Sequence, residues 1–214
     1  MQIMLNKLVT LFKSIFMIAK RIFDVCFAMI GIILLSPLFL LISLLIMADT
    51  GAPILYFQKR VGLKRKVFNV AKFRTMVIAA DRLGCLTIGN DDRRITKTGY
   101  YLRKYKLDEL PQLFNVLIGD MSFVGPRPEV SKYVKLYTPK QLRVLSIKPG
   151  ITDWASIQFF NENELLARSE DPEKLYINRI MPSKIEQNLS YIDQRNMLTD
   201  MKIIFQTLKR VIHN

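Results

Sequence analysis

Hydrophobic residues dominate the first fifty positions of the chain. In residues 1–21 they recur at helical spacing between Lys and Arg, a pattern typical of a helix at a membrane surface. Residues 25–47 carry no charge, and a run of that length is a candidate membrane helix. The run is too long for a signal peptide, and no small-residue cleavage motif follows it. We therefore predict that residues 1–50 form an amphipathic segment followed by a membrane element.

A proline interrupts this apolar run near its middle, in the pair Ser36-Pro37. Proline inside a helix removes a backbone hydrogen bond and clashes with the preceding turn, so it bends or breaks the helix. Because Lys and Arg flank the run on both sides, the positive-inside rule selects no orientation. Two topologies are therefore possible. One is a kinked helix that spans the membrane, which is the more common structure, and the other is a re-entrant helix with both ends in the cytoplasm. Asp24 is costly in lipid, so we expect it to pair with Lys20 or Arg21.

Residues 51–214 alternate between short apolar and polar stretches. The stretches 54–57 and 67–73 flank a basic turn at Gly62 and predict a β-hairpin. We expect this hairpin to carry three cations toward one site: Arg60, Lys72 and Arg74. Short helices are predicted over 100–106, 129–137 and 141–146.

The end of the chain predicts an amphipathic helix. Its apolar positions step by three or four residues: Leu198, Met201, Phe205, Leu208 and Ile212. Such a stripe serves either to pack on the domain or to dock at the membrane surface. Together these elements predict an α+β, mainly helical fold, in which residues 51–214 form one small domain beside the membrane element.

A further helical pattern surrounds two adjacent carboxylates, Asp108 and Glu109. Its apolar positions are Leu107, Leu110, Leu113, Phe114 and Leu117. Proline is tolerated only in a first turn, so Pro111 predicts a helix that begins near Asp108, and Gly119 predicts its end. Asp108 would then be the N-cap, in a position where the helix dipole favours negative charge and free N–H groups attract phosphate.

Cations lie on both sides of this stretch. Arg103, Lys104 and Lys106 precede it, and Arg127 follows it between two prolines. Adjacent carboxylates among fixed cations predict a phosphoryl-transfer site, whereas an ordinary capped helix on a basic surface accounts for the same residues about equally well.

Charge and histidine content narrow the possible chemistry. The formal net charge of +14 implies a partner rich in phosphate, such as anionic lipid, nucleic acid or nucleotide. The single histidine, His213, stands next to the last residue, which disfavours His-dependent nucleophilic catalysis and zinc sites. Cys26 and Cys85 form no motif, as is typical of a reducing compartment. If the chain is an enzyme, carboxylates, cations and a hard metal ion must carry its chemistry.

Seven motifs occur in a fixed order over residues 18–160. They are Lys20-Arg21-x-Phe23-Asp24, Ser36-Pro37, Phe57-Gln58-x-Arg60-x-Gly62, Lys72-Phe73-Arg74-Thr75-Met76, Leu107-Asp108-Glu109-Leu110-Pro111-Gln112, Gly119-Asp120-Met121-Ser122-Phe123-Val124-Gly125-Pro126-Arg127-Pro128 and Pro149-Gly150-Ile151-Thr152. Each motif alone is weak, but in this order they resemble the monotopic phosphoglycosyl transferases, bacterial sugar transferases that initiate glycan assembly on a polyprenol phosphate. The length of the chain is similar to that of the minimal members of that family.

The resemblance implies a reaction. A UDP-sugar would give its phosphosugar to undecaprenyl phosphate and release UMP, the first membrane step of O-antigen (lipopolysaccharide), capsule, exopolysaccharide or glycoprotein assembly. The position that matches the family's nucleophile is Asp108, with Glu109 as its partner, and the reaction would be ping-pong through a phosphosugar-Asp108 intermediate. Magnesium is the implied cofactor, with Glu109 as its ligand. Lys72, Arg103 and Arg127 match positions that face the phosphates, and Arg60 and Arg74 are further candidates for substrate binding.

The resemblance also decides between the two topologies. The match at Ser36-Pro37 implies a re-entrant helix, with the catalytic domain, residues 51–214, on the cytoplasmic face of the bacterial inner membrane. Residues 153–156 read Asp-Trp-Ala-Ser where many members have Gly-Trp-Ala-Gln, so the sugar stays open, as does a homodimer. Two other functions compete: a basic membrane protein that binds lipid or nucleic acid without catalysis, and a nucleotide-sugar hydrolase. No nucleic-acid motif is present, so we expect no nucleic-acid partner.

Overall fold

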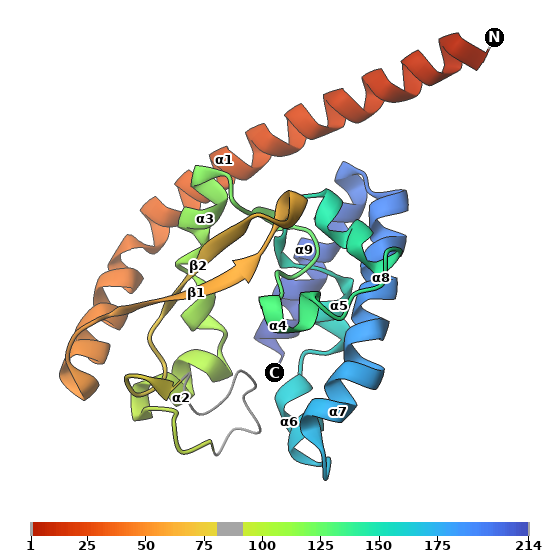
Figure 1. Ribbon diagram of the computed structural model, residues 1–214. Helices are drawn as coiled ribbons and strands as arrows, with labels where there is room; N and C mark the ends of the chain where they lie inside the picture. The colour runs from red at the N-terminus through yellow and green to blue at the C-terminus, as the bar shows by residue number, and fades with distance from the viewer. Residues whose placement is uncertain (1, 81–91, 214) are drawn as a thin grey trace.

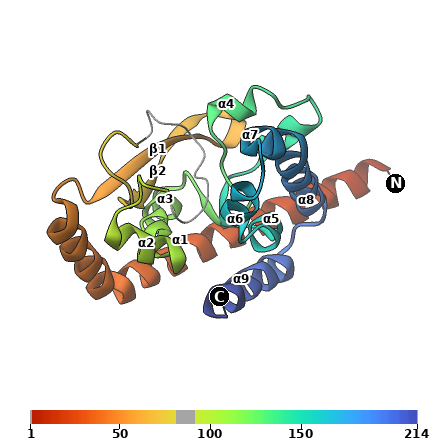
Figure 2. The same cartoon turned by 90° about the horizontal axis from the view of Figure 1, so that it is seen from below.

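The computed structural model describes residues 2–80 and 92–213, with side chains from Ser14 onward, and Cys85 lies outside this part. The long helix α1 (Gln2–Thr50) runs along one side of a domain built from the remaining elements. Its N-terminal part extends beyond that domain (Figure 1 and Figure 2). The expectation of a mainly helical fold with a small hairpin is confirmed.

Helix α1 continues through Pro37 without interruption. Proline at this position cannot donate to the Ile33 carbonyl, and the Ser36 hydroxyl donates to that oxygen instead, at 2.8 Å. The predicted break is therefore a bend: the orange part of α1 turns away from the line of its red N-terminal part (Figure 1). Among the described helices, one is long and apolar enough to cross a membrane, the Ser14–Thr50 stretch of α1. Its re-entrant course stays a prediction.

Polar side chains of α1 fasten it to the domain. Arg21 donates to the carbonyl oxygens of residues 116 and 117, at 2.7 and 2.9 Å, near the end of α3 (Gln112–Ile118). Asp24 accepts hydrogen bonds from the Ser122 hydroxyl and the Phe123 amide, both at 3.1 Å. The expected pairing of Asp24 with Lys20 or Arg21 is wrong, because Asp24 and Arg21 have these distant partners and Lys20 pairs with Asp200.

The predicted hairpin is confirmed. Strands β1 (Leu55–Val61) and β2 (Val67–Phe73) are antiparallel, and the 3-10 turn η1 (Leu63–Arg65) joins them. Helix α3 holds β2 through Asn115, whose carboxamide accepts from the Ala71 amide at 2.9 Å and donates to the carbonyl of residue 69 at 2.7 Å. The hairpin is thus fixed against the helix that follows Asp108 and Glu109.

A second, smaller sheet pairs β3 (Ser122–Val124) with β4 (Gly150–Thr152) in parallel. The two strands approach closely, since a Cβ on Gly150 would lie 2.1 Å from the Gly125 nitrogen. This contact requires glycine and places the loop after β3 beside the residues that follow β4.

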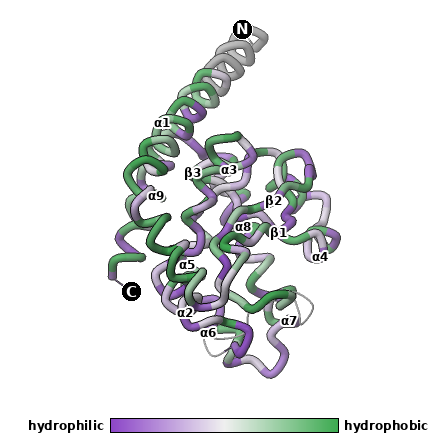
Figure 3. The backbone as a smooth tube through the Cα atoms, turned by 90° about the vertical axis from the view of Figure 1, so that its left-hand side faces the viewer, coloured by the Kyte–Doolittle hydropathy of each residue, from purple (hydrophilic) through white to green (hydrophobic). Residues whose placement is uncertain are grey.

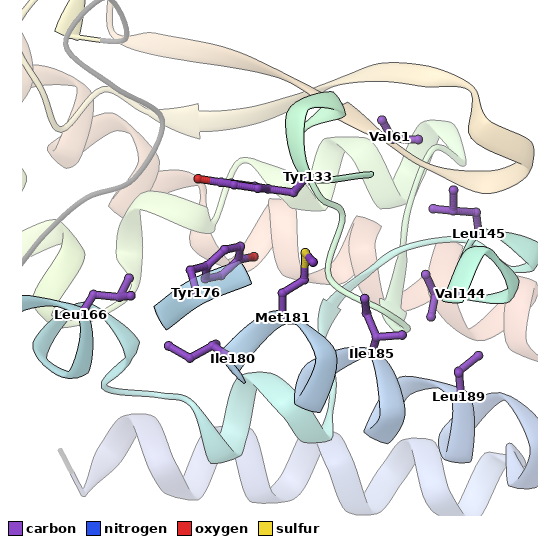
Figure 4. Close-up of a cluster of buried hydrophobic side chains, with 10 residues drawn as sticks. All are labelled: Val61, Tyr133, Val144, Leu145, Leu166, Tyr176, Ile180, Met181, Ile185 and Leu189. Atoms are coloured by element: carbon purple, nitrogen blue, oxygen red, sulfur yellow. The ribbon is translucent and has the colours of Figure 1, made fainter. Parts of the chain in front are cut away.

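Helices make up most of the rest of the domain. They are α2 (Lys97–Lys104), α4 (Ser131–Val134), η4 (Gln141–Ser146), α5 (Trp154–Gln158), α6 (Glu162–Ala167), α7 (Pro172–Leu175), η5 (Tyr176–Ile180), α8 (Met181–Gln194) and α9 (Met197–Ile212). The helix expected over 129–137 is shorter, and the one over 141–146 is a 3-10 helix. A large buried cluster lies between β1, α4, η4 and α8, and Figure 4 shows Tyr133 and Tyr176 close together in it, with ring centroids 4.9 Å apart.

The apolar stripe of α9 is largely exposed rather than buried against the domain. Phe205, Leu208 and Ile212 are 67, 57 and 77 % exposed, whereas the buried residues of this helix are Asp200 and Ile203. Packing of the stripe on the domain is therefore wrong, and docking at the membrane surface stays a prediction. Figure 3 shows hydrophobic residues along much of α1 and α9.

Candidate functional site

Asp108 and Glu109 lie in a 3-10 turn, η3 (Leu107–Glu109), just before α3. Helix α3 begins at Gln112 with Pro111 at its N-cap, so the expectation that Asp108 caps this helix is wrong. The chain makes a separate turn first, and Lys106 enters it in the left-handed conformation, with φ of 55°. The predicted end at Gly119 is confirmed, since Gly119 adopts φ of +96° as the C-cap.

Both carboxylate oxygens of Glu109 have cationic partners. The Arg127 guanidinium contacts the two oxygens as a fork: Nη1 donates to Oε2 at 3.0 Å and Nη2 donates to Oε1. The Lys72 ammonium, supplied by β2, donates to Oε1 at 3.0 Å. Bidentate Arg–carboxylate pairs fix geometry as well as charge. Glu109 is therefore held in one position by a strand and a loop from different parts of the chain.

Asp108 is in a different situation. It is 7 % exposed, and in the described part of the chain no donor is hydrogen-bonded to its carboxylate. Burial raises the pKa of Asp108, and so does the charge of Glu109, against the opposing effect of nearby cations. Burial also opposes ionisation of Glu109, but Arg127 and Lys72 hold the pKa of that carboxyl well below its usual range. Glu109 is thus ionised and paired, whereas the neighbouring Asp108 carboxyl group has no paired cation among the described residues.

The three cations of the hairpin have different partners. Lys72 pairs with Glu109, and burial lowers the pKa of this lysine despite the charge of Glu109. Arg60 donates to the Gln58 side chain at 2.8 and 3.1 Å and pairs with Glu129 at 3.2 Å.

Arg74 and Arg103 complete the set of predicted cations. Arg74 reaches the end of α1, where its Nη2 donates to the Thr50 hydroxyl and, at 2.7 Å, to the Gly51 carbonyl. Its Nε and Nη1 are buried without partners. Arg103, near the end of α2, is one of the cations that oppose the raised pKa of Asp108. The hairpin therefore does not direct its three cations to one carboxylate.

A single cavity of about 1270 Å³ nevertheless joins all five predicted cations to the two carboxylates. Its lining includes Asp108, Glu109, Arg60, Lys72, Arg74, Arg103 and Arg127. Apolar side chains from α1 and α9 line the same cavity, among them Phe23, Phe27, Leu35, Ile204 and Leu208. The space thus combines a polar, cationic wall with an apolar wall, which suits a substrate with both characters.

One residue of the site was not found by sequence reasoning. Asp153 is fully buried, and its Oδ2 accepts the Arg127 backbone amide at 2.9 Å. Its Oδ1 accepts the Ser156 amide at 2.5 Å and caps α5. The available signal was an Asp directly before an apolar helical pattern, which predicts an N-cap but does not reveal the contact with Arg127.

The donor set suits a hard metal ion that shares its coordination with substrate. The described residues contain no group of three or more His, Cys, Asp or Glu that could hold a metal. Magnesium is commonly bound through one or two carboxylates together with substrate phosphates and water. Asp108 and Glu109 provide such oxygens, although in this structure both oxygens of Glu109 accept from Arg127 and Lys72.

Comparison with known proteins gives relatives over most of the chain. Residues 15–214 match the family model described as "Bacterial sugar transferase". The "Uncharacterized sugar transferase EpsL" of Bacillus subtilis (strain 168) is 38% identical over 196 residues, which cover 92% of this chain and 88% of that protein.

Two relatives have names that state an activity. The "UDP-N-acetylgalactosamine-undecaprenyl-phosphate N-acetylgalactosaminephosphotransferase" of Aeromonas hydrophila is 35% identical over 211 residues, 97% of this chain and 47% of that protein. The "UDP-glucose:undecaprenyl-phosphate glucose-1-phosphate transferase" of Xanthomonas campestris pv. campestris is 37% identical over 202 residues, 92% of this chain and 39% of that protein. The chain therefore spans less than half the length of these two relatives. Since the family model and EpsL both match nearly the whole chain, the chain belongs to the bacterial sugar transferase family and to the transferase class of enzymes.

Proposed function

We propose that this chain transfers a phosphosugar from a UDP-sugar to undecaprenyl phosphate and releases UMP. The reaction would be the first membrane step in the assembly of a bacterial glycan, such as an exopolysaccharide. The observation that carries the proposal is the difference between the two neighbouring carboxylates: Glu109 is paired with Arg127 and Lys72, and Asp108 is unpaired in the same cavity. The names of the two longer relatives support this class of substrates.

The mechanism we infer is ping-pong with Asp108 as the nucleophile. A carboxylate oxygen of Asp108 attacks the phosphorus that bears the sugar, the bond from that phosphorus to the UMP oxygen breaks, and UMP leaves. An oxygen of the lipid phosphate then attacks the same phosphorus and releases the Asp108 carboxylate. The product is a lipid diphosphate that carries the sugar.

A diphosphate bound beside two carboxylates would be repelled by their negative charge, and the cations of the cavity offset this repulsion. Arg127 and Lys72 already neutralise Glu109, and Arg103 and Lys106 contribute positive potential at Asp108. Preorganised charges of this kind stabilise the transferring phosphoryl group. Magnesium, when bound, would supply further neutralisation of the phosphate oxygens. Glu109 would hold it if Arg127 or Lys72 turned from this carboxylate to the substrate phosphates.

The proposed location follows from α1. Its apolar Ser14–Thr50 stretch supports membrane association. We further propose that α1 is re-entrant and that the catalytic domain lies on the cytoplasmic face of the inner membrane, where UDP-sugars occur. The exposed apolar stripe of α9 would then contact membrane lipid.

Intact-protein mass after brief exposure to a UDP-sugar, without lipid acceptor, tests the chemistry. Wild type should gain one phosphosugar, and Asp108→Asn should gain none. Asp193→Asn, a change at an exposed ion pair with Arg143, is the matched control and should label like wild type. If wild type never gains this mass and kinetics require both substrates before UMP leaves, the lipid phosphate attacks directly. Repeated UMP release without lipid would indicate the hydrolase.

A further inference from the structure

Helices α5 and α8 present two buried oxygen atoms that have no hydrogen-bond partner. They are the Ser156 hydroxyl oxygen and the Asn188 carboxamide oxygen. Asn188 is only 6 % exposed. Among the described residues, Arg74 also has buried side-chain nitrogens without a partner. Buried polar atoms are nearly always hydrogen-bonded in native proteins, so each exception needs a physical explanation.

The neighbouring polar groups of the two helices are satisfied. The Gln187 carboxamide donates to the Gln158 side chain at 2.7 Å, which joins α8 to α5. Lys184 of α8 donates to Glu162 at 2.7 Å. The region is therefore well hydrogen-bonded, and the deficit is confined to Ser156 and Asn188, both of which line the cavity that contains Asp108.

Asp153 links Ser156 to Arg127. One oxygen of its carboxylate accepts the Ser156 amide at 2.5 Å, and the other accepts the Arg127 amide at 2.9 Å. The Arg127 side chain in turn pairs with Glu109. Ser156 is thus linked through Asp153 to the loop that carries Arg127.

We propose that Ser156 and Asn188 form a hydrogen-bonding subsite for an uncharged part of the nucleotide sugar. The carboxamide oxygen of Asn188 is only an acceptor, so it would take a hydroxyl or an N–H group, and the Ser156 hydroxyl would bond the same or an adjacent group. A phosphate is a poor occupant, because an ionised phosphate has only acceptor oxygens and the Asn188 carboxamide oxygen needs a donor. The proposal rests on the proposed function and adds the residues that recognise the donor beyond its phosphates.

Binding measurements on two variants test this subsite. Asn188→Leu replaces the amide by an apolar group of similar size, and Ser156→Ala removes a single oxygen. Gln187→Leu is the matched control, since it makes the same chemical change on the same helix, outside the cavity lining. Calorimetry would measure the binding of UDP-glucose, UDP-N-acetylgalactosamine and UMP to each full-length protein in detergent.

We expect each of the two variants to bind at least one UDP-sugar ~10-fold more weakly than wild type, as is common for the loss of one hydrogen bond to a buried group. Unchanged UMP binding would place the recognised group on the sugar, and equally weakened UMP binding would place it on the uridine. The thermal midpoint of Asn188→Leu without ligand should equal or exceed that of wild type, because an unpaired buried polar group is removed.

Wild-type affinity in both variants would overturn the subsite and assign the two oxygens to buried water. If Asn188→Leu does not fold, Ser156→Ala decides alone. The proposed function is judged separately, from lipid-dependent UMP release by wild type. Release by wild type together with unchanged affinities in both variants would reject the subsite and keep the transferase. If the variants bind more weakly but wild type releases no UMP, the subsite is kept and the transferase is rejected.

Discussion

Lys20 of α1 forms an ion pair with Asp200 of α9, although 180 positions separate them in the sequence. Asp200 is almost fully buried, and its other oxygen accepts the Tyr191 hydroxyl at 2.6 Å. The membrane helix and the last helix are therefore joined through one carboxylate. This contact fixes the position of α9, whose apolar stripe is exposed, relative to the Ser14–Thr50 stretch.

The first prediction concerns this ion pair. Asp200→Asn keeps the shape and the Tyr191 contact but leaves Lys20, which is 16 % exposed, without a counter-charge. We expect a loss of ~3 kcal/mol in the free energy of unfolding in detergent, since removal of one partner of a buried pair is costly. Adding Lys20→Met should recover part of that loss. Arg143→Met, at an exposed pair with Asp193, should cost less than ~1 kcal/mol, and an equal cost at both sites would contradict the prediction.

The second prediction concerns Arg127. Arginine can contact both oxygens of a carboxylate or a phosphate with its planar fork, and the single ammonium group of lysine cannot. Arg127→Lys should therefore lower kcat by at least ~100-fold, as is typical when a transition-state donor is lost, while the protein stays folded and membrane-bound. UMP release at saturating substrates measures kcat, circular dichroism measures folding, and sedimentation with membranes measures membrane binding. Arg143→Lys is the surface control, and near-normal turnover by Arg127→Lys would make Arg127 structural.

Local patterns predicted the parts of the fold that depend on near neighbours. The hairpin around Gly62 and the helix end at Gly119 follow from backbone preferences of single residues, and both are confirmed. Ser36 supplies the hydrogen bond that Pro37 removes, which is also a local effect. The start of α3 was predicted wrongly because Pro111 fits both the first turn of a helix and the N-cap after a separate 3-10 turn.

Contacts between distant segments were not predictable from a single sequence. Both hydrogen-bond partners of Asp24 lie in β3 rather than one turn away, and Asp153 holds Arg127 across the two strands of the parallel pair. The composition of α9 predicts an apolar stripe but not which face the domain buries. The resemblance identified the carboxylates and cations of the site, whereas their partners required the structure.

The third prediction links the stability of the protein to Asp108. Its pKa is raised in the folded state, so the folded protein binds a proton more tightly than the unfolded chain. Ionised Asp108 therefore costs stability at neutral pH, and this cost disappears as the pH falls toward 3.8, the ordinary value. Asp108→Asn should abolish turnover yet stabilise the protein by roughly 1 kcal/mol at pH 7, with a smaller difference in acid. If Asp108→Asn and wild type differ in stability by the same amount at both pH values, the raised pKa is contradicted.

The fourth prediction concerns magnesium. Chelation should stop UMP release, and added Mg²⁺ should restore it. Glu109→Gln should raise the Mg²⁺ concentration needed for half-maximal rate by ~10-fold, because a neutral amide is a weaker ligand than a carboxylate, and excess Mg²⁺ should partly restore its rate. Asp108→Asn should not recover at any Mg²⁺ concentration. An unchanged Mg²⁺ requirement in Glu109→Gln would show that Glu109 is not a metal ligand and that it only positions Arg127 and Lys72.

The last prediction concerns the course of α1. If the helix is re-entrant, its start and the catalytic domain lie on the same side of the membrane. In a background with both native cysteines replaced by alanine, Ser14→Cys and Ser190→Cys should both resist an impermeant thiol reagent in intact cells and react after the membrane is opened. Pro37→Ala restores the backbone N–H that can bond the Ile33 carbonyl, which removes the cause of the bend. It should therefore straighten α1 and expose Ser14→Cys to external reagent in a measurable fraction of molecules, while Ser190→Cys stays protected. Full external labelling of Ser14→Cys without the proline change would establish a spanning helix instead.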